Sequence, residues 1–302
     1  MPPDPRRSPR ALLSRRELLV AGAGLIVAGA CGGSDGDGGA SATTTDAADA
    51  STGAVLLKLF DANRVPVGSE VRMPVGIGDP DGTPRSGGPA ELAVGIATEE
   101  GELVTTLTVP RHGEGLPRVY YPVHATLPAP GIYRVRTVID GEGVEGAIQA
   151  VGPEQAPPVP GPGDDMIPLT TPTTAAPQGV DPICTRQPPC PLHEVALDAA
   201  LQAGKPVALL IATPAFCAVR ICGPVVDVLA AELEQYGDRI TMIHAEVYTS
   251  LEAEETTEAV KAYQIVSEPI LFLAGADGTI LRRYDVIFDG VELRAGLDAL
   301  LA

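Results

Sequence analysis

Two cysteines five positions apart, Cys217 and Cys222, are the residues of this chain whose type and spacing could do redox chemistry. They lie in the stretch FCAVRICGPVVD, which ends at the start of an apolar run. In a regular helix, residues five apart have Cα atoms about 8.7 Å apart, beyond the limit of about 7 Å for a disulfide. A working thiol pair therefore requires Cys217 to lie in a loop before the helix and the residues between the cysteines to bend.

The chemistry expected of this pair depends on its surroundings. A Cys217 thiolate near a helix N-terminus would be stabilised by free backbone N–H groups and by the helix dipole. Arg220 could add to this effect, whereas Glu268 would oppose it if its carboxylate faced the sulfur. The alternative, which stays open here, is that Cys217 and Cys222 form a structural bridge or are two buried thiols.

A second pair, Cys184 and Cys190, lies in the stretch CTRQPPC, where two prolines turn the loop. We expect these two cysteines to form a structural disulfide that pins the preceding linker onto the C-terminal domain. Electron relay to the Cys217 pair is the alternative. We predict no metal site and no cofactor, and we interpret His112 and His124 as loop and strand residues rather than metal ligands.

The fifth cysteine, Cys31, follows an N-terminal segment with basic residues and then an apolar run. The stretch SRRELL has paired arginines, and a thirteen-residue apolar run after it ends in AGAC. That run is too short for an ordinary membrane span and suits a signal peptide. This pattern resembles a bacterial lipoprotein signal with a twin-arginine (Tat) export motif, which implies removal of residues 1–30, lipidation of Cys31 and a location on the outer face of the cytoplasmic membrane. An ordinary cleaved signal, with Cys31 incidental, is the alternative.

Composition and charge limit the kinds of partner that the protein can bind. The chain has 302 residues, 45% of them hydrophobic, and a net charge of −18. Such an acidic protein would be repelled by nucleic acid, which we exclude as a partner. Residues 31–53 are rich in Gly, Ser, Thr, Ala and Asp, and we expect them to be a flexible tether between the lipid anchor and the first domain.

Residues 54–151 alternate between apolar and polar side chains with a period of two, as in Val71, Met73, Val75 and Ile77. Turn signals such as DPDGTP and RHGEG separate these runs, so the segment predicts a β-sandwich. The stretch PGIYRVRTVI resembles a late strand of immunoglobulin-like domains, with Tyr133 as a candidate tyrosine corner. Residues 152–182 are rich in Pro, Gly and Thr, and we expect an extended linker that contributes to no core.

Residues 183–302 change to the pattern of an α/β domain. Helices are predicted at about 193–204, 223–236, 251–265 and 291–301, and strands at 206–213, 239–247, 269–275 and 279–286. The first two strands, joined through a helix, should be parallel, and the last two, joined by a hairpin, should be antiparallel.

This order, with cysteines after the first strand and Pro269 opening the third, resembles a thioredoxin-like domain. The resemblance implies that Cys217 is the nucleophile and that Pro269 is a cis-proline in a loop facing the thiol. Phe216 stands where the family usually has Trp, and Ile211 replaces its buried acid. The whole chain therefore predicts an immunoglobulin-like sandwich followed by a thioredoxin-like α/β domain.

The function this implies is that of a membrane-anchored thiol–disulfide oxidoreductase outside the cytoplasm. Cys217 would attack, Cys222 would resolve, and Pro269 would form the edge where substrate docks. The partners would be thiols and disulfides of exported proteins, together with the membrane through the lipid anchor. A binding or scaffold lipoprotein without enzymatic activity is the main alternative. A Sco-type copper chaperone, with His244 as its distant histidine, is less well supported.

Overall fold

The computed structural model describes residues 53–218 and 220–302. The predictions for the signal peptide (1–30), for Cys31 and for the tether up to residue 52 lie outside these residues. Within the described part of the chain, no helix has the length and hydrophobicity needed to cross a membrane.

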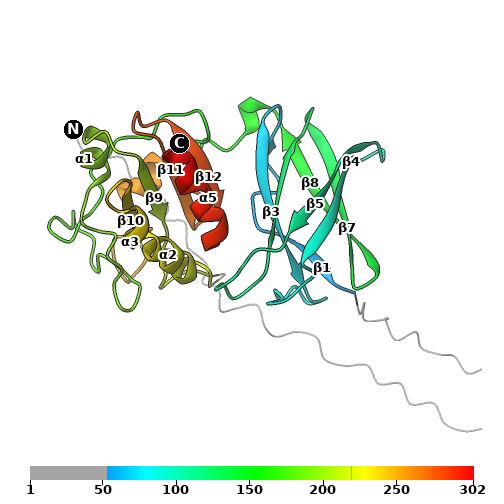
Figure 1. Ribbon diagram of the computed structural model, residues 1–302, viewed down its shortest axis with the longest axis horizontal. Helices are drawn as coiled ribbons and strands as arrows, with labels where there is room; N and C mark the ends of the chain where they lie inside the picture. The colour runs from blue at the N-terminus through cyan, green and yellow to red at the C-terminus, as the bar shows by residue number, and fades with distance from the viewer. Residues whose placement is uncertain (1–52, 219) are drawn as a thin grey trace, which may run out of the picture. The chain divides into compact units, whose positions relative to one another are not determined.

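The N-terminal part is β-rich, as the period-two pattern predicted, and contains two sheets (Figure 1). In β7 (Gly131–Ile139), for example, Tyr133, Val135 and Ile139 are buried while Arg136 is exposed. One sheet has the order β1-β3-β6: β1 (Val55–Lys58), β3 (Glu70–Gly78) and β6 (Tyr121–Thr126). The other has the order β2-β8-β7-β4-β5: β2 (Val65–Pro66), β8 (Glu142–Val151), β7 (Gly131–Ile139), β4 (Glu91–Thr98) and β5 (Leu103–Pro110).

Both sheets contribute to a single cluster of buried hydrophobic side chains, including Met73 and Val123 from one sheet and Val94 and Ile148 from the other. The hydroxyl of Tyr133 donates to the carbonyl oxygen of Ala129 at 2.8 Å. This hydrogen bond ties β7 to the turn before it, at the position that the sequence suggested for a tyrosine corner.

The segment 152–182 departs from the expectation that it would contribute to no core. It begins with the short 3-10 helix η1 (Pro153–Gln155) and then runs beside the start of β12 (Ile280–Asp285), where Gly163 N–H donates to Ile280 O at 2.9 Å. Met166 N–H donates to Gly278 O, in the turn before β12, at 2.9 Å. Met166 is buried, and Ile167 and Leu169 pack against the same cluster. The apolar residues within this Pro/Thr-rich run cover hydrophobic surface of the C-terminal sheet, which composition alone did not reveal.

The C-terminal part is built on a four-stranded sheet with the order β10-β9-β11-β12. Its strands are β9 (Val207–Ile211), β10 (Thr241–Ala245), β11 (Ile270–Ala274) and β12 (Ile280–Asp285). Strands β9 and β10 are parallel, and β11 is antiparallel to both β9 and β12, so the predicted strand directions are confirmed. Every residue of β9 and β11 is buried, as their near-continuous apolar sequence requires.

Helices cover both faces of this sheet (Figure 1). Ala208 and Leu210 of β9 share a cluster with residues of α2 and α5, whereas Val207, Leu209 and Ile211 share one with residues of α1 and α4. The helices are α1 (Leu197–Gln202), α2 (Cys222–Ala231), α3 (Leu233–Tyr236), α4 (Glu258–Ala262) and α5 (Gly290–Leu300). β9 is one of the two inner strands of the sheet, and Cys217 lies in the loop that follows it.

The helix predicted over 251–265 is formed only by α4. Tyr248 and Thr256 form an isolated antiparallel bridge, and Thr257 N–H donates to Val247 O at 2.9 Å. The Thr257 hydroxyl also donates to Glu246 O at 2.8 Å. These bonds hold the first half of the segment in a loop, although its Glu- and Ala-rich sequence favours a helix.

His112 and His124 lie outside every group of described residues that could hold a metal ion. His112 Nδ1 lies 3.0 Å from Asp289 Oδ1, and His124 Nδ1 lies 3.4 Å from Glu70 Oε1.

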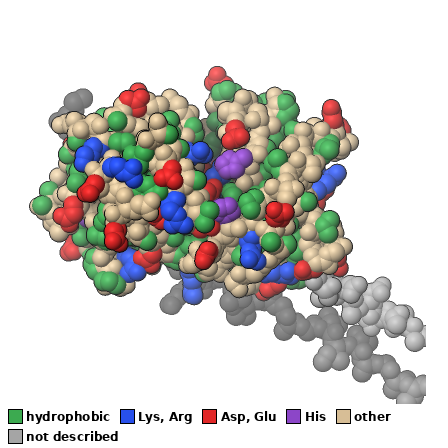
Figure 2. Space-filling view, in the orientation of Figure 1, with side chains coloured by type: hydrophobic (Ala, Val, Ile, Leu, Met, Phe, Trp, Pro, Cys, Tyr) green, Lys and Arg blue, Asp and Glu red, His purple; other side chains and the backbone are tan. Residues whose placement is uncertain are grey.

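On the face drawn in Figure 2, positive and negative side chains are interspersed over the surface.

Candidate functional site

Cys217 and Cys222 form a disulfide, with Cα atoms 5.9 Å apart. Cys217 lies in the loop after β9, and α2 begins only at Cys222, as the five-residue spacing requires. Arg220 adopts the left-handed conformation, with φ of 54°, and its N–H donates to Cys217 O at 3.0 Å. This tight turn brings the two cysteines together, so the helix itself does not have to span them.

The two sulfurs differ in access to solvent. Cys222 is fully buried, whereas Cys217 is half-buried and follows Phe216, a residue that is 36% exposed. The Cys222 N–H, at the start of α2, donates to Cys217 Sγ at 3.2 Å. A Cys217 thiolate released by reduction would keep this donor and the field of the helix N-terminus, which stabilise negative charge on sulfur.

Glu268 completes this centre. Its Oε2 lies 3.1 Å from Cys222 Sγ and accepts from Thr213 N–H at 2.8 Å. Burial raises the pKa of Glu268 to about 7, and the Thr213 bond only partly offsets this rise. The sequence suggested that Glu268 could oppose a Cys217 thiolate, but the structure places its carboxyl oxygen beside Cys222. The peptide bond between Glu268 and Pro269 is cis, as predicted.

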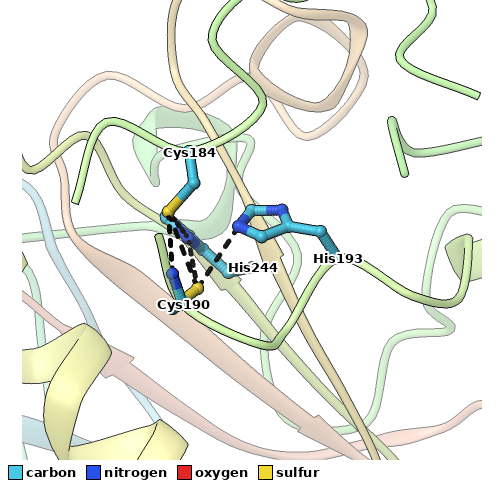
Figure 3. Close-up of side chains that lie close together, drawn as sticks. All are labelled: Cys184, Cys190, His193 and His244. Atoms are coloured by element: carbon cyan, nitrogen blue, oxygen red, sulfur yellow. Dashed lines mark hydrogen bonds between the residues drawn. The ribbon is translucent and has the colours of Figure 1, made fainter. Parts of the chain in front are cut away.

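The second cysteine pair differs from the prediction. Cys184 and Cys190 are free thiols, with Sγ atoms 3.7 Å apart, and the expected disulfide is not formed. Two imidazoles lie against them: His193 Nε2 is 3.2 Å from Cys190 Sγ, and His244 Nδ1 is 3.4 Å from Cys190 Sγ and 3.8 Å from Cys184 Sγ (Figure 3). Cys184, Cys190, His193 and His244 form what we call the Cys2His2 cluster. In this arrangement Cys190 Sγ contacts both imidazoles as well as Cys184 Sγ.

The sheet edge positions this cluster. His244 is a fully buried residue of the edge strand β10, and its N–H donates to Leu192 O at 2.9 Å. This bond places the 190–193 loop directly beside β10. His193 is buried as well, and its carbonyl oxygen accepts from Thr174 N–H at 2.8 Å. Residues far apart in sequence therefore meet at one edge.

Within the cluster the two thiols differ in acidity. The hydrogen bond between the Cys184 and Cys190 sulfurs lowers the pKa of the Cys184 thiol, and the hydrogen bonds with His193 and His244 lower it further, whereas burial opposes the shift. Cys184 and burial in turn raise the pKa of Cys190. Such a pair holds its first negative charge on Cys184, because adjacent sulfurs cannot both ionise easily without a cation nearby.

Thr185 connects the two cysteine centres. Its hydroxyl donates to Glu246 Oε1 at 2.9 Å and accepts from Ala215 N–H at 3.1 Å. The Thr185 N–H also donates to Glu246 Oε1, at 2.6 Å. The loop that carries Cys184 is thereby fastened to the loop that carries Cys217.

Sequence reasoning missed His193, and it considered His244 only for a copper chaperone. The signal was present locally, because Cys184, Cys190 and His193 form a C-x5-C-x2-H run of metal-ligand residue types. His244 lies 51 positions further on, and only the pairing of the loop with β10 brings it to the sulfurs.

Comparison with known proteins identifies no family. No family model matches the chain, and no curated protein matches it. Solved structures that resemble part of it include an engineered protein from a structural genomics consortium (16% identity, TM-score 0.23, 33% of this chain and 20% of that chain). A point mutant of Salmonella alpha-2-macroglobulin is similar at 14% identity and a TM-score of 0.26, over 40% of this chain and 7% of that chain. An endo-beta-1,4-mannanase from Thermotoga petrophila is similar at 14% identity and a TM-score of 0.22, over 33% of this chain and 20% of that chain. The chain thus spans at most a fifth of each of these three proteins, and none of them bears on function.

Proposed function

We propose that the protein is a thiol–disulfide oxidoreductase whose C-terminal part is a thioredoxin-like domain. The observation that carries this proposal is the disulfide between half-buried Cys217 and buried Cys222, with the Glu268 carboxyl beside the buried sulfur. The sheet order, the parallel and antiparallel pairings and the cis-proline after Glu268 support the proposed fold. The β-rich part is proposed to be an immunoglobulin-like spacer.

In the oxidising direction, a substrate thiolate attacks Sγ of Cys217. The Cys217–Cys222 bond breaks, a mixed disulfide forms at Cys217, and Cys222 leaves with the electron pair. Protonated Glu268, 3.1 Å away, gives its proton to the Cys222 sulfur. A second substrate thiolate then attacks the substrate sulfur, which leaves the substrate oxidised and Cys217 as a thiolate.

In the reducing direction, the Cys217 thiolate attacks a substrate disulfide and one substrate sulfur leaves as a thiolate. Ionised Glu268 takes the proton from Cys222, which then attacks Cys217 Sγ and releases the second substrate sulfur. A carboxyl pKa of about 7 suits both directions, because acid and base forms are then both populated near neutral pH.

The proposed setting is the outer face of the cytoplasmic membrane, with the protein held by a lipid on Cys31. Thiols and disulfides of exported proteins would be its substrates. Phe216, partly exposed next to Cys217 and edge-on to Tyr248 with ring centroids 5.5 Å apart, offers an apolar surface beside the reactive sulfur.

The test is an insulin-reduction and dithiol-oxidation assay on the full chain. Cys217→Ser should abolish both activities, and Cys222→Ser should accumulate mixed disulfides at Cys217 because the resolving thiol is gone. Glu254→Gln, an exposed carboxyl substitution, is the matched control and should be fully active. Activity that survives Cys217→Ser unchanged would leave a scaffold lipoprotein as the better account.

A further inference from the structure

We propose that the Cys2His2 cluster is a structural zinc site, with Cys184, Cys190, His193 and His244 as its four ligands. The ligand atoms all lie within 4.8 Å of one another. This proposal is independent of the redox function, because it involves neither Cys217 nor Cys222.

The spacing of the ligand atoms matches the edges of a zinc tetrahedron. Zn–S bonds of about 2.3 Å and Zn–N bonds of about 2.0–2.1 Å at tetrahedral angles give S···S edges of about 3.8 Å and S···N edges of about 3.6 Å. The observed Sγ–Sγ distance between Cys184 and Cys190 is 3.7 Å. The observed S···N distances to the two histidines are 3.2, 3.4 and 3.8 Å. Four of the six edges are therefore close to those of a zinc tetrahedron, and the other two, from His193 Nε2 to Cys184 Sγ and to His244 Nδ1, lie within 4.8 Å, so one ion could draw the four atoms together.

The surroundings of His244 set its ring for metal binding. Its Nε2 lies 3.0 Å from the carbonyl oxygen of Ala212, which can only accept, so Nε2 carries the hydrogen. In the neutral ring Nδ1 is then the atom with a free lone pair, and it faces both sulfurs. A backbone carbonyl holding the far nitrogen of a ligating histidine is a common feature of zinc sites. Cys190 N–H also donates to Cys184 Sγ, at 3.4 Å, which would help to hold a thiolate.

The ligand types in the cluster indicate which metal it would bind and whether that metal would be structural or catalytic. Two thiolates and two imidazoles in a tetrahedral arrangement favour zinc, and two thiolates neutralise its charge in a buried place. Four protein ligands leave no open position for water or substrate, so the site is structural rather than catalytic. The ion would hold the 184–193 loop against β10, and through Thr185 it would support the loop of Cys217.

The experiment is metal analysis of the full chain, purified without chelator or added reductant. We expect one zinc per chain, and an intense tetrahedral spectrum with thiolate-to-metal charge transfer after exchange with Co2+. Cys184→Ser and His244→Gln should lose the zinc. Cys217→Ser/Cys222→Ser and His124→Gln, matched cysteine and histidine substitutions outside the cluster, should retain one zinc.

Two further results decide the matter even if the ligand variants fail to fold. Wild-type protein denatured with chelator but without reductant should yield Cys184 and Cys190 as two alkylatable thiols. The proposal would be overturned if the denatured protein contained a Cys184–Cys190 disulfide. It would also be overturned if the native protein contained no zinc and gave no tetrahedral spectrum with Co2+. Copper in place of zinc would overturn the choice of metal, and zinc retained in both ligand variants would place the ion elsewhere.

Discussion

Glu268 Oε2 lies 3.1 Å from Sγ of Cys222, the buried sulfur of the disulfide. Ile211 of β9 fills the position where the sequence resemblance implies a buried acid, so a proton donor was expected to be missing. Glu268 reaches the buried sulfur from a different strand connection, the loop before β11. In the proposed mechanism this carboxyl moves the proton that Cys222 gains or loses in each cycle.

Glu268→Gln should slow the resolution of mixed disulfides by about 100-fold or more, because a positioned general acid or base typically accelerates a reaction by about 10²–10⁴-fold. In the wild-type protein the reducing rate should rise with pH as Glu268 ionises around pH 7, because only the carboxylate can accept the Cys222 proton. The rise around pH 7 should disappear in the variant. Stopped-flow kinetics of insulin reduction across this pH range, with Glu254→Gln as control, measures both effects. An unchanged pH profile in Glu268→Gln would remove Glu268 from the mechanism.

The same carboxyl makes the stability of the oxidised protein depend on pH. The folded pKa of about 7 lies above the ordinary value of 4.5, so between these values the folded chain holds a proton that the unfolded chain releases. The free energy of unfolding therefore falls as pH rises from about 4.5 to about 7. Relative to wild type, Glu268→Gln should gain stability over this window, by at most about 3 kcal/mol. Denaturation curves at pH 4 and pH 8 test this, and a difference that does not change with pH would contradict it.

Thr185→Val should lower the free energy of unfolding by about 1–2 kcal/mol, because it removes the two hydrogen bonds that the Thr185 hydroxyl makes with Glu246 and with the exposed Ala215 N–H, while the bond from the Thr185 N–H to Glu246 remains. Thr185→Ser keeps the hydroxyl and should restore most of the loss. Chemical denaturation of both variants gives the comparison. Equal stability of the valine and serine variants would mean that the link between the two cysteine loops contributes nothing.

The parallel direction of β9 and β10 and the antiparallel direction of β11 and β12 could be predicted from the sequence, because a helix joins the first pair and a hairpin joins the second. The order of the strands in the sheet and the antiparallel pairing of β11 with β9 were not predicted. The spacing of Cys217 and Cys222 likewise restricted the start of α2, since a helix over both would hold the sulfurs apart. The short α4 could not be predicted, because its preceding segment has good helix formers and only the contacts of Thr257 with the end of β10 prevent the helix.

The Cys2His2 cluster could not be predicted from residues that are neighbours in the sequence. Cys184 and Cys190 are close in sequence, and a local disulfide was the simplest pairing for a chain that the sequence predicts to be exported. Their surroundings are set by His244, which reaches them only because Leu192 pairs with the edge of β10. Met166 is a similar case, since an apolar residue in a proline-rich run becomes part of a core only when the sheet beneath it is known.

Lipidation of Cys31 is a prediction of the sequence alone. Mass spectrometry of the mature protein from its native membrane should find residues 1–30 removed and a diacylglyceryl-modified Cys31 at the N-terminus. Cys31→Ala should release the protein from the membrane fraction. A free amine at another residue, or membrane association that survives Cys31→Ala, would contradict the anchor.

The central claim is that Cys217 and Cys222 are a reversible redox couple. The most direct measurement equilibrates the native full chain with glutathione buffers of defined potential, then counts alkylated Cys217 and Cys222 by mass spectrometry. The account predicts that both thiols appear together in one two-electron transition, with a midpoint within the range of roughly −120 to −270 mV that thiol–disulfide oxidoreductases span. A pair that stays oxidised at every potential in the native protein, and opens only on unfolding, would show that the disulfide is structural.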